Sequence, residues 1–241
     1  MRILVTRPEP DASREAEALA RQGHEAVVAP LLAIEFFPDV PLQLEGAQAL
    51  LVTSRNALRA LAARRELGKA LELPLLAVGE ATAREGRELG FRDVTIGSGT
   101  AVDLARLIPE ELEPKSGPLV HLAGETLAFD LKSALEKEGF TVRQPVLYRA
   151  VPAREFPAQA LRLLKSAKLN GVILMSPRTA EIFAALFRRL GAVTQGNTLV
   201  CYCLSEAVAE AMAPLGLEIR IAARPREEDV LALLDTEAAS S

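Results

Sequence analysis

The chain alternates short apolar runs with segments whose apolar residues recur at helical spacing, and it does so along its whole length. Segments such as 13–23 and 127–139 place apolar residues at positions i, i+3, i+4 and i+7, which predicts amphipathic helices. Strands that are apolar on both faces and separated by such helices are typical of a parallel sheet covered on both sides. The sequence therefore predicts an α/β fold, with strands within 2–6, 25–34, 49–53, 73–78, 93–96, 118–122, 141–150, 171–175, 198–203 and 218–222.

Size and composition limit the classes of protein that fit this pattern. The 241 residues suffice for one large domain or two small ones, and 49% hydrophobic residues can fill a sizeable core. A net charge of −4 argues against a nucleic-acid-binding surface. No apolar run approaches the length of a membrane span, and the first residues show no apolar signal-peptide region. We therefore expect a cytoplasmic protein without a nucleic-acid or membrane partner.

The sequence also contains internal repeats. Segment 3–33 resembles 119–148, and segment 51–96 resembles 173–221, so four units, each a pair of strand–helix modules, follow in the order A, B, A′, B′. Two groupings are open. Either A joins B and A′ joins B′ as consecutive domains, or B joins A′ as a central domain while A joins B′ as a terminal one.

Two unusually long extended runs favour the second grouping. They are 25–38 and 141–152, and each is interrupted by a proline, Pro30 or Pro145. A strand that is too long for one sheet and broken by proline suggests a crossing between two domains. We predict two domains that face each other across a cleft and are joined by a two-strand connector. The expected bounds are 1–34 plus 151–241 for the terminal domain, 38–146 for the central domain, and about 33–38 and 147–152 for the connectors.

Little in the sequence indicates a metal or a cofactor. Cys201 and Cys203 lie two apart on one predicted strand, where they point to the same face and are expected to be buried rather than disulfide-bonded. His24 and His121 are far apart in sequence, and no metal-binding motif surrounds them. The motifs of dinucleotide sites, P-loops and hydrolase nucleophile elbows are missing. We expect neither a metal nor a cofactor.

Ligands of parallel α/β sheets bind at the carboxyl ends of the strands, where loops enter helices. Hydroxyl residues and glycines dominate those loops, whereas His, Cys and Asp are absent from them. Helix starts of this kind offer backbone N–H groups and hydroxyls to an anion, although Ser54 and Ser176 can also be read as simple helix caps. The predicted ligand is a large anion. The candidate loops are 6–8, 53–56, 79–82, 123–126, 176–179 and 205–206.

Tyr148 differs from the other aromatic residues because it lies in one of the predicted crossings. Its hydroxyl either rests at a wet domain boundary or faces the cleft as a hydrogen-bond donor and weak acid. Tyr202, between two cysteines on an apolar strand, is expected in the core.

The chain carries four characteristic segments in this order: LVTRPEP at 4–10, LVTSRNAL at 51–58, AVGEATAREGRELG at 77–90 and PVLYRA at 145–150. Together they resemble the uroporphyrinogen-III synthase family, over essentially the whole chain and at compatible lengths. The resemblance implies two flavodoxin-like α/β domains joined by a two-strand connector. It also implies a cyclising hydro-lyase that closes linear hydroxymethylbilane to uroporphyrinogen III. This reaction loses water and inverts ring D through a spiro intermediate, without cofactor or metal.

The resemblance also implies roles for individual residues. Tyr148 matches the family tyrosine that assists departure of the substrate hydroxyl. The family's Thr-Ser, Gly-x-x-Thr-Ala and Ser-Pro motifs match positions 53–54, 79–83 and 176–177. With the strand-end loops, they give the predicted substrate-binding residues Thr6, Arg7, Thr53, Ser54, Arg55, Gly79, Thr82, Gly124, Ser176, Pro177, Arg178 and Ser205.

The sequence departs from the family pattern in two places. Ser205 and Val208 stand where the terminal-domain copy of Gly-x-x-Thr-Ala has Gly and Thr, so a usual substrate contact is missing. Arg55 stands where Pro is common, which adds a cation near the expected carboxylates.

Two other classes of protein share several of these features. A non-catalytic tetrapyrrole- or polyanion-binding sensor on the same scaffold should lack the tyrosine at position 148. A periplasmic receptor for a polyanion should carry a signal peptide. The enzyme interpretation adds hydroxymethylbilane as the substrate and a transient handover from hydroxymethylbilane synthase. We expect a monomer, because two domains already bury the sheets.

Overall fold

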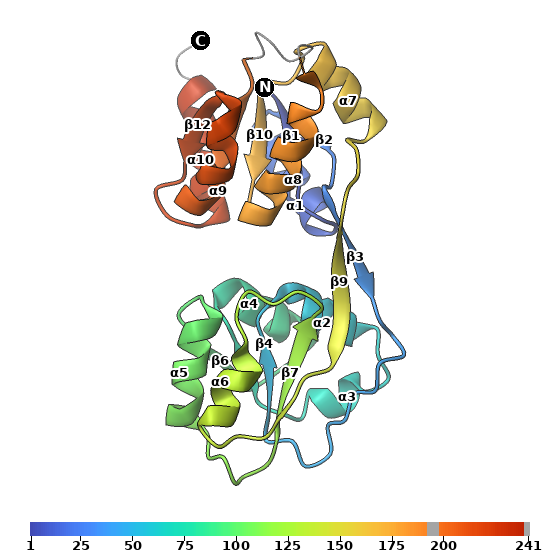
Figure 1. The fold of residues 1–241 in the computed structure, drawn as a ribbon, viewed down its shortest axis with the longest axis vertical. Coiled ribbons are helices and arrows are strands. Elements are labelled where there is room, and N and C mark those ends of the chain that lie inside the picture. Colours follow the sequence, from blue (N-terminus) through green and yellow to red (C-terminus); the bar gives the residue numbers. More distant parts are fainter. Residues whose placement is uncertain (192–197, 239–241) are drawn as a thin grey trace. The chain divides into compact units, whose positions relative to one another are not determined.

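The computed structural model describes residues 1–191 and 198–238, and it divides into two compact units. Unit 1 combines Met1–Ala33 with Val151–Ser241, and unit 2 is Ile34–Ala150 (Figure 1). The stretches 192–197 and 239–241, which the sequence assigns to the terminal domain, lie outside the described residues.

Unit 1 is built on a parallel sheet in the order β12-β11-β10-β1-β2. The first strand of the chain lies between β2 and β10, with Leu4 opposite Val172, so distant parts of the sequence form one sheet. The strands are β1 (Arg2–Val5), β2 (Glu25–Val28), β10 (Gly171–Leu174), β11 (Val200–Cys203) and β12 (Glu218–Ile221). The helices are α1 (Asp11–Arg21), α7 (Ala158–Lys165), α8 (Pro177–Arg188), α9 (Glu206–Met212), the 3₁₀ turn η2 (Ala213–Leu215) and α10 (Glu227–Ala238).

Helices cover both faces of this sheet, which explains why its strands are apolar without alternation. Successive strand residues point to opposite faces. Leu4 accordingly packs in a cluster with Phe183 of α8, whereas its neighbour Ile3 packs with Leu19 of α1 and with Tyr202. Burial on two faces fits the parallel arrangement predicted from the sequence.

Unit 2 holds a second sheet in the order β3-β9-β7-β4-β5-β6, and β8 also pairs with β7. The pairings from β6 through β4 to β7, β8 and β9 are parallel. The strands are β3 (Leu32–Phe36), β4 (Ala49–Val52), β5 (Leu75–Ala77), β6 (Val94–Ile96), β7 (Leu119–Gly124), β8 (Val142–Arg143) and β9 (Val146–Pro152). The helices are α2 (Arg55–Ala62), α3 (Leu67–Ala70), α4 (Glu80–Leu89), α5 (Ala101–Glu111) and α6 (Leu131–Lys137).

The two long extended runs are each split at their proline, into β2 and β3 around Pro30 and into β8 and β9 around Pro145. The chain passes from unit 1 to unit 2 within β3 and returns within β9. These two strands are neighbours (Figure 1), with hydrogen bonds from Phe37 N–H to the Leu147 carbonyl and from Ala153 N–H to the Leu31 carbonyl. The pairing is therefore antiparallel.

The predicted fold class, α/β with parallel sheets, is confirmed by this architecture. Cys201, Tyr202 and Cys203 are all fully buried on β11, as expected. Burial raises the pKa of both thiols to about 12, so they behave as small apolar side chains.

Candidate functional site

The carboxyl end of β4 runs directly into helix α2 through Thr53 and Ser54. Ser54 has an extended backbone, and its hydroxyl accepts a hydrogen bond from the backbone N–H of Asn56 at 3.2 Å. Ser54 is thus the N-cap of α2. The cap uses the acceptor side of the hydroxyl and leaves its proton available for another group.

Tyr148 on β9 brings its phenol to this helix start. Burial raises the pKa of Tyr148 above its usual value, and the nearby Ser54 side chain lowers it again in part. The phenol is therefore protonated at neutral pH and can donate a hydrogen bond.

Gly124, at the end of β7, makes room for the Tyr148 ring. A Cβ at position 124 would lie 2.6 Å from Cζ and 2.8 Å from the hydroxyl oxygen of Tyr148. Gly124 is itself buried. Its structural role is to let the ring lie against the strand.

His121 on β7 is not among the residues that the sequence predicts for the site. The side chain is 1% exposed. Its Nδ1 lies 3.1 Å from Oε1 of Gln144, and its Nε2 lies 3.4 Å from Oγ1 of Thr53. The signal was present in 118-PLVHL-122, because a polar residue in an apolar strand must find a partner when it is buried.

Gly79 and Thr82 lie at the start of α4, the next helix of unit 2. Gly79 is the N-cap, and a Cβ there would lie 3.3 Å from the Gly99 backbone, so the two loops approach closely. Thr82 is 6% exposed and faces the interior of the unit. Arg55 opens α2 beside Ser54 and is half-buried.

Thr6 and Arg7 follow β1 in unit 1, and both have partners within that unit. The Thr6 hydroxyl donates to the Ile173 carbonyl at 2.8 Å and is 1% exposed. Arg7 is 9% exposed, and its guanidinium contacts Glu227 at 2.7 Å and Glu15 at 3.4 Å. A buried cation needs such partners, so Glu15 and Glu227 stabilise the Arg7 charge, and the ligand role of the two residues stays a prediction.

The other predicted residues of unit 1 lie at the starts of α8 and α9. Ser176 caps α8, with its hydroxyl accepting from Thr179 N–H at 3.2 Å, and exposed Pro177 takes the first helical position before Arg178. Ser205 is the N-cap residue of α9 but makes no side-chain cap bond. Val208 is fully buried, where the family pattern has a threonine.

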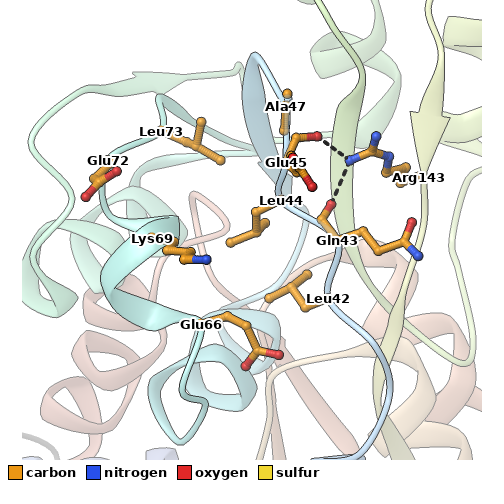
Figure 2. A pocket seen from close by; sticks show the side chains of 11 residues that line it. Leu42, Gln43, Leu44, Glu45, Ala47, Glu66, Lys69, Glu72, Leu73 and Arg143 are labelled. Carbon is orange, nitrogen blue, oxygen red and sulfur yellow. Dashed lines mark hydrogen bonds between the residues drawn. The ribbon is translucent and has the colours of Figure 1, made fainter.

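A pocket of about 840 Å³ lies at the opposite edge of the unit 2 sheet (Figure 2). Its lining includes Ala47 before β4, Leu73 before β5 and Arg143 in β8, so it opens at the amino ends of the strands. The Arg143 guanidinium donates to the carbonyls of Gln43 and Glu45 at 3.0 and 2.8 Å. None of the predicted site residues lines this pocket.

Within residues 1–191 and 198–238, no three His, Cys, Asp or Glu side chains gather where they could hold a metal ion. The helices of this same part of the chain include none that is long and apolar enough to cross a membrane. The groups gathered at the unit 2 strand ends are instead hydroxyls, a neutral phenol and helix N-termini. Such groups can donate or accept hydrogen bonds and bind anions.

Solved structures of proteins from two bacteria have a similar fold. The uroporphyrinogen-III synthetase from Helicobacter pylori is 19% identical, with a TM-score of 0.66 over 98% of this chain and 100% of that chain. A mutant uroporphyrinogen III synthase from the extremely thermophilic bacterium Thermus thermophilus is 18% identical, with a TM-score of 0.59 over 100% of both chains. These likenesses support the fold. A search of curated protein sequences finds no match.

A family model described as "Uroporphyrinogen-III synthase HemD" matches residues 13–232. The match spans nearly all of the 241 residues and confirms the resemblance seen in the sequence. The chain therefore belongs to the uroporphyrinogen-III synthase family and is an enzyme of heme biosynthesis.

Proposed function

We propose that the chain is a cyclising hydro-lyase that converts hydroxymethylbilane to uroporphyrinogen III, and that Tyr148 assists the departing hydroxyl. The substrate is a linear tetrapyrrole with eight carboxylates and a hydroxymethyl group at one end. Closing it requires loss of that hydroxyl as water. Placing ring D in the inverted orientation then requires control over which carbon reacts.

The contact of Tyr148 with Ser54 and Gly124 is the observation that carries this proposal. Ser54 accepts from Asn56 N–H, so its own proton is left for the neighbouring Tyr148 oxygen, in agreement with the lowering influence of Ser54 on the pKa of Tyr148. The phenolic proton then remains for the substrate. As the C–O bond breaks, the departing oxygen keeps the bonding electrons and accepts the proton that makes it water.

The remaining steps rearrange carbon bonds and need orientation more than acid–base groups. Loss of water leaves a protonated, cationic azafulvene and the Tyr148 phenolate, and the substituted carbon of ring D attacks the cation to form a spiro-pyrrolenine. Fragmentation and reclosure invert ring D, and the proton lost when the pyrrole is restored returns to the phenolate. Uncatalysed closure gives the non-inverted isomer, so the protein must hold the substrate ends in the arrangement that favours the spiro route.

Helix starts and arginines are proposed to bind the substrate carboxylates. Ser54 and Arg55 lie at the start of α2, and Ser176 and Arg178 lie at the start of α8. Backbone N–H groups in the first turn carry partial positive charge and suit carboxylates. Such binding does not depend on a positive net charge, which agrees with the value of −4.

The finer aspects of the cellular role are also proposals. The composition and the division into two compact units support a cytoplasmic monomer. The lability of a hydroxymethylbilane to spontaneous closure supports direct handover from hydroxymethylbilane synthase.

Incubating freshly made hydroxymethylbilane with the full chain tests the proposal. The products are oxidised and separated as isomer III and isomer I, with a protein-free blank alongside. We expect isomer III to dominate with the chain and isomer I in the blank. A product mixture no richer in isomer III than the blank would contradict the enzyme role. If the chain still bound the tetrapyrrole, that outcome would favour a sensor module.

A further inference from the structure

His121 has a partner at each of its two ring nitrogens. Nδ1 faces Oε1 of Gln144 at 3.1 Å, and Nε2 faces Oγ1 of Thr53 at 3.4 Å. The amide oxygen of Gln144 can only accept, so the ring proton belongs on Nδ1. Nε2 is then an acceptor, and the Thr53 hydroxyl is the donor that faces it.

The ring remains neutral at neutral pH. The side chain is 1% exposed, and this burial lowers the pKa of His121 below its usual value, with the Gln144 hydrogen bond and Asp130 offsetting part of the shift. A neutral imidazole with its proton on Nδ1 cannot donate from Nε2. The direction of the contact with Thr53 is therefore fixed.

We propose that His121 is a positioning residue that turns the Thr53 proton inward, so that Thr53 offers the substrate a hydrogen-bond acceptor. A hydroxyl has one proton and two lone pairs. With the proton held by Nε2, the Oγ1 lone pairs remain for the ligand. Thr53 is half-buried and directly precedes Ser54, the partner of Tyr148. This inference rests on the proposed function.

The substrate group that fits an acceptor at Thr53 is a pyrrole N–H of hydroxymethylbilane. A carboxylate would need a donor there, and the only hydroxyl proton of Thr53 is committed to His121. This assignment departs from the sequence expectation that the strand-end hydroxyls meet carboxylates. The carboxylates are left to the backbone N–H groups and arginines at the helix starts.

A double-mutant cycle with hydroxymethylbilane tests the inference. Thr53→Val keeps the shape but removes the hydroxyl, and His121→Leu removes the acceptor that orients it. We expect each single variant to raise KM about fivefold, the worth of one net hydrogen bond, with little change in kcat. The double variant should be no worse than either single variant. His121→Gln, which restores an acceptor near the Nε2 position, should recover most of the lost affinity.

Two kinetic results would overturn the inference. If Thr53 donated to a carboxylate, His121→Leu would free its proton and leave KM unchanged or lower. If the KM increases multiplied in the double variant, the two residues would act independently. Should His121→Leu fail to fold, Gln144→Leu replaces it, because it removes the group that fixes the tautomer. That variant should raise KM in the wild-type background and leave it unchanged in the Thr53→Val background.

A second readout does not depend on activity. The chain has two histidines, so ¹⁵N spectra of the imidazole rings can be assigned by comparison with His24→Gln. We expect the His121 proton on Nδ1 and an unprotonated Nε2. The ¹⁵N chemical shift of Nε2 should change in Thr53→Val. A proton on Nε2 would overturn the inference even if the wild type makes isomer III. Failure to make isomer III would instead refute the proposed function and leave the tautomer result intact.

Discussion

Each sheet places a glycine beneath a tyrosine ring of a neighbouring strand, but the two tyrosines have different surroundings. In unit 1, a Cβ at Gly171 would lie 2.4 Å from Cε2 of Tyr202, which is fully buried. In unit 2, a Cβ at Gly124 would lie 2.6 Å from Cζ of Tyr148, which is half-buried and whose pKa is influenced by Ser54. The same packing of a tyrosine ring on a glycine fills the core of unit 1 with Tyr202 and places the Tyr148 phenol at the strand ends in unit 2.

The threonines that follow the first parallel strand of each unit differ in a similar way. In unit 1, Thr6 donates its hydroxyl proton to the Ile173 carbonyl and is buried from solvent. Thr53 contacts His121 and stays half-buried in unit 2. The comparison shows that the hydroxyl of Thr6 is used by a contact within unit 1, whereas Thr53 stays partly accessible in unit 2.

Replacing each of the two glycines by alanine should have the largest effects, and these effects should differ between the units. Gly124→Ala displaces Tyr148, and we expect turnover to fall by about a hundredfold, the usual cost of misplacing a reacting group by an ångström. Gly171→Ala overpacks the core around Tyr202 and should lower the free energy of unfolding by about 1–3 kcal/mol. Turnover and urea unfolding of both variants provide the measurements. Normal turnover in folded Gly124→Ala would show that Tyr148 has no catalytic role.

Glu15 should make the stability of unit 1 depend on pH, because its carboxyl group is buried beside Arg7. Burial raises its pKa from the usual 4.5 to about 7, although Arg7 offsets part of the shift. The folded state therefore binds this proton more tightly than the unfolded state. Stability should fall by about 1–3 kcal/mol as pH rises from 4.5 to 7 and then level off.

Urea unfolding of the wild type and Glu15→Gln across that pH range checks this prediction. Glutamine cannot ionise, so the difference in unfolding free energy between the two proteins should change in favour of Glu15→Gln as pH rises. A difference that stays constant from pH 4.5 to 7 would show that Glu15 ionises at its ordinary pKa.

Replacing the serine N-caps of α2 and α8 should have the smallest effect on stability. Ser54 and Ser176 occupy equivalent positions in the two units. Ser54→Ala and Ser176→Ala each remove a side-chain acceptor for a helix N–H, and each should lower stability by about 1 kcal/mol. Ser54→Ala should also lower kcat, because Tyr148 loses its partner, whereas Ser176→Ala should act on KM. Equal kcat values for the two variants would show that Ser54 only caps its helix and has no influence on turnover.

The fold could be predicted from the sequence because its signals are local. Apolar runs and helical spacing indicated parallel sheets, and Pro30 and Pro145 marked the points at which the long runs divide. Much of the site could not be predicted, because it depends on contacts between distant residues. Arg7 follows a strand as a ligand-binding cation would, yet its partner Glu227 lies 220 residues away.

His121 illustrates the opposite difficulty. It lies within an apolar run, so its register beside Leu51 and its contact with Thr53 become visible only when β4 and β7 are paired. Gly124 is predicted in a loop but ends β7, and its contact with the ring of Tyr148, two strands later in the chain, is visible only in the structure.

The turnover of Tyr148→Phe, measured against Tyr202→Phe, shows whether the Tyr148 hydroxyl takes part in the reaction. Both changes remove one phenolic oxygen, but only Tyr148 contacts Ser54 at the strand ends of unit 2. We expect Tyr148→Phe to form isomer III more slowly than the wild type by more than about tenfold, with unfolding nearly unchanged. Tyr202→Phe should keep the wild-type rate per folded molecule. An unchanged rate in Tyr148→Phe would contradict the account and leave Tyr148 a structural residue.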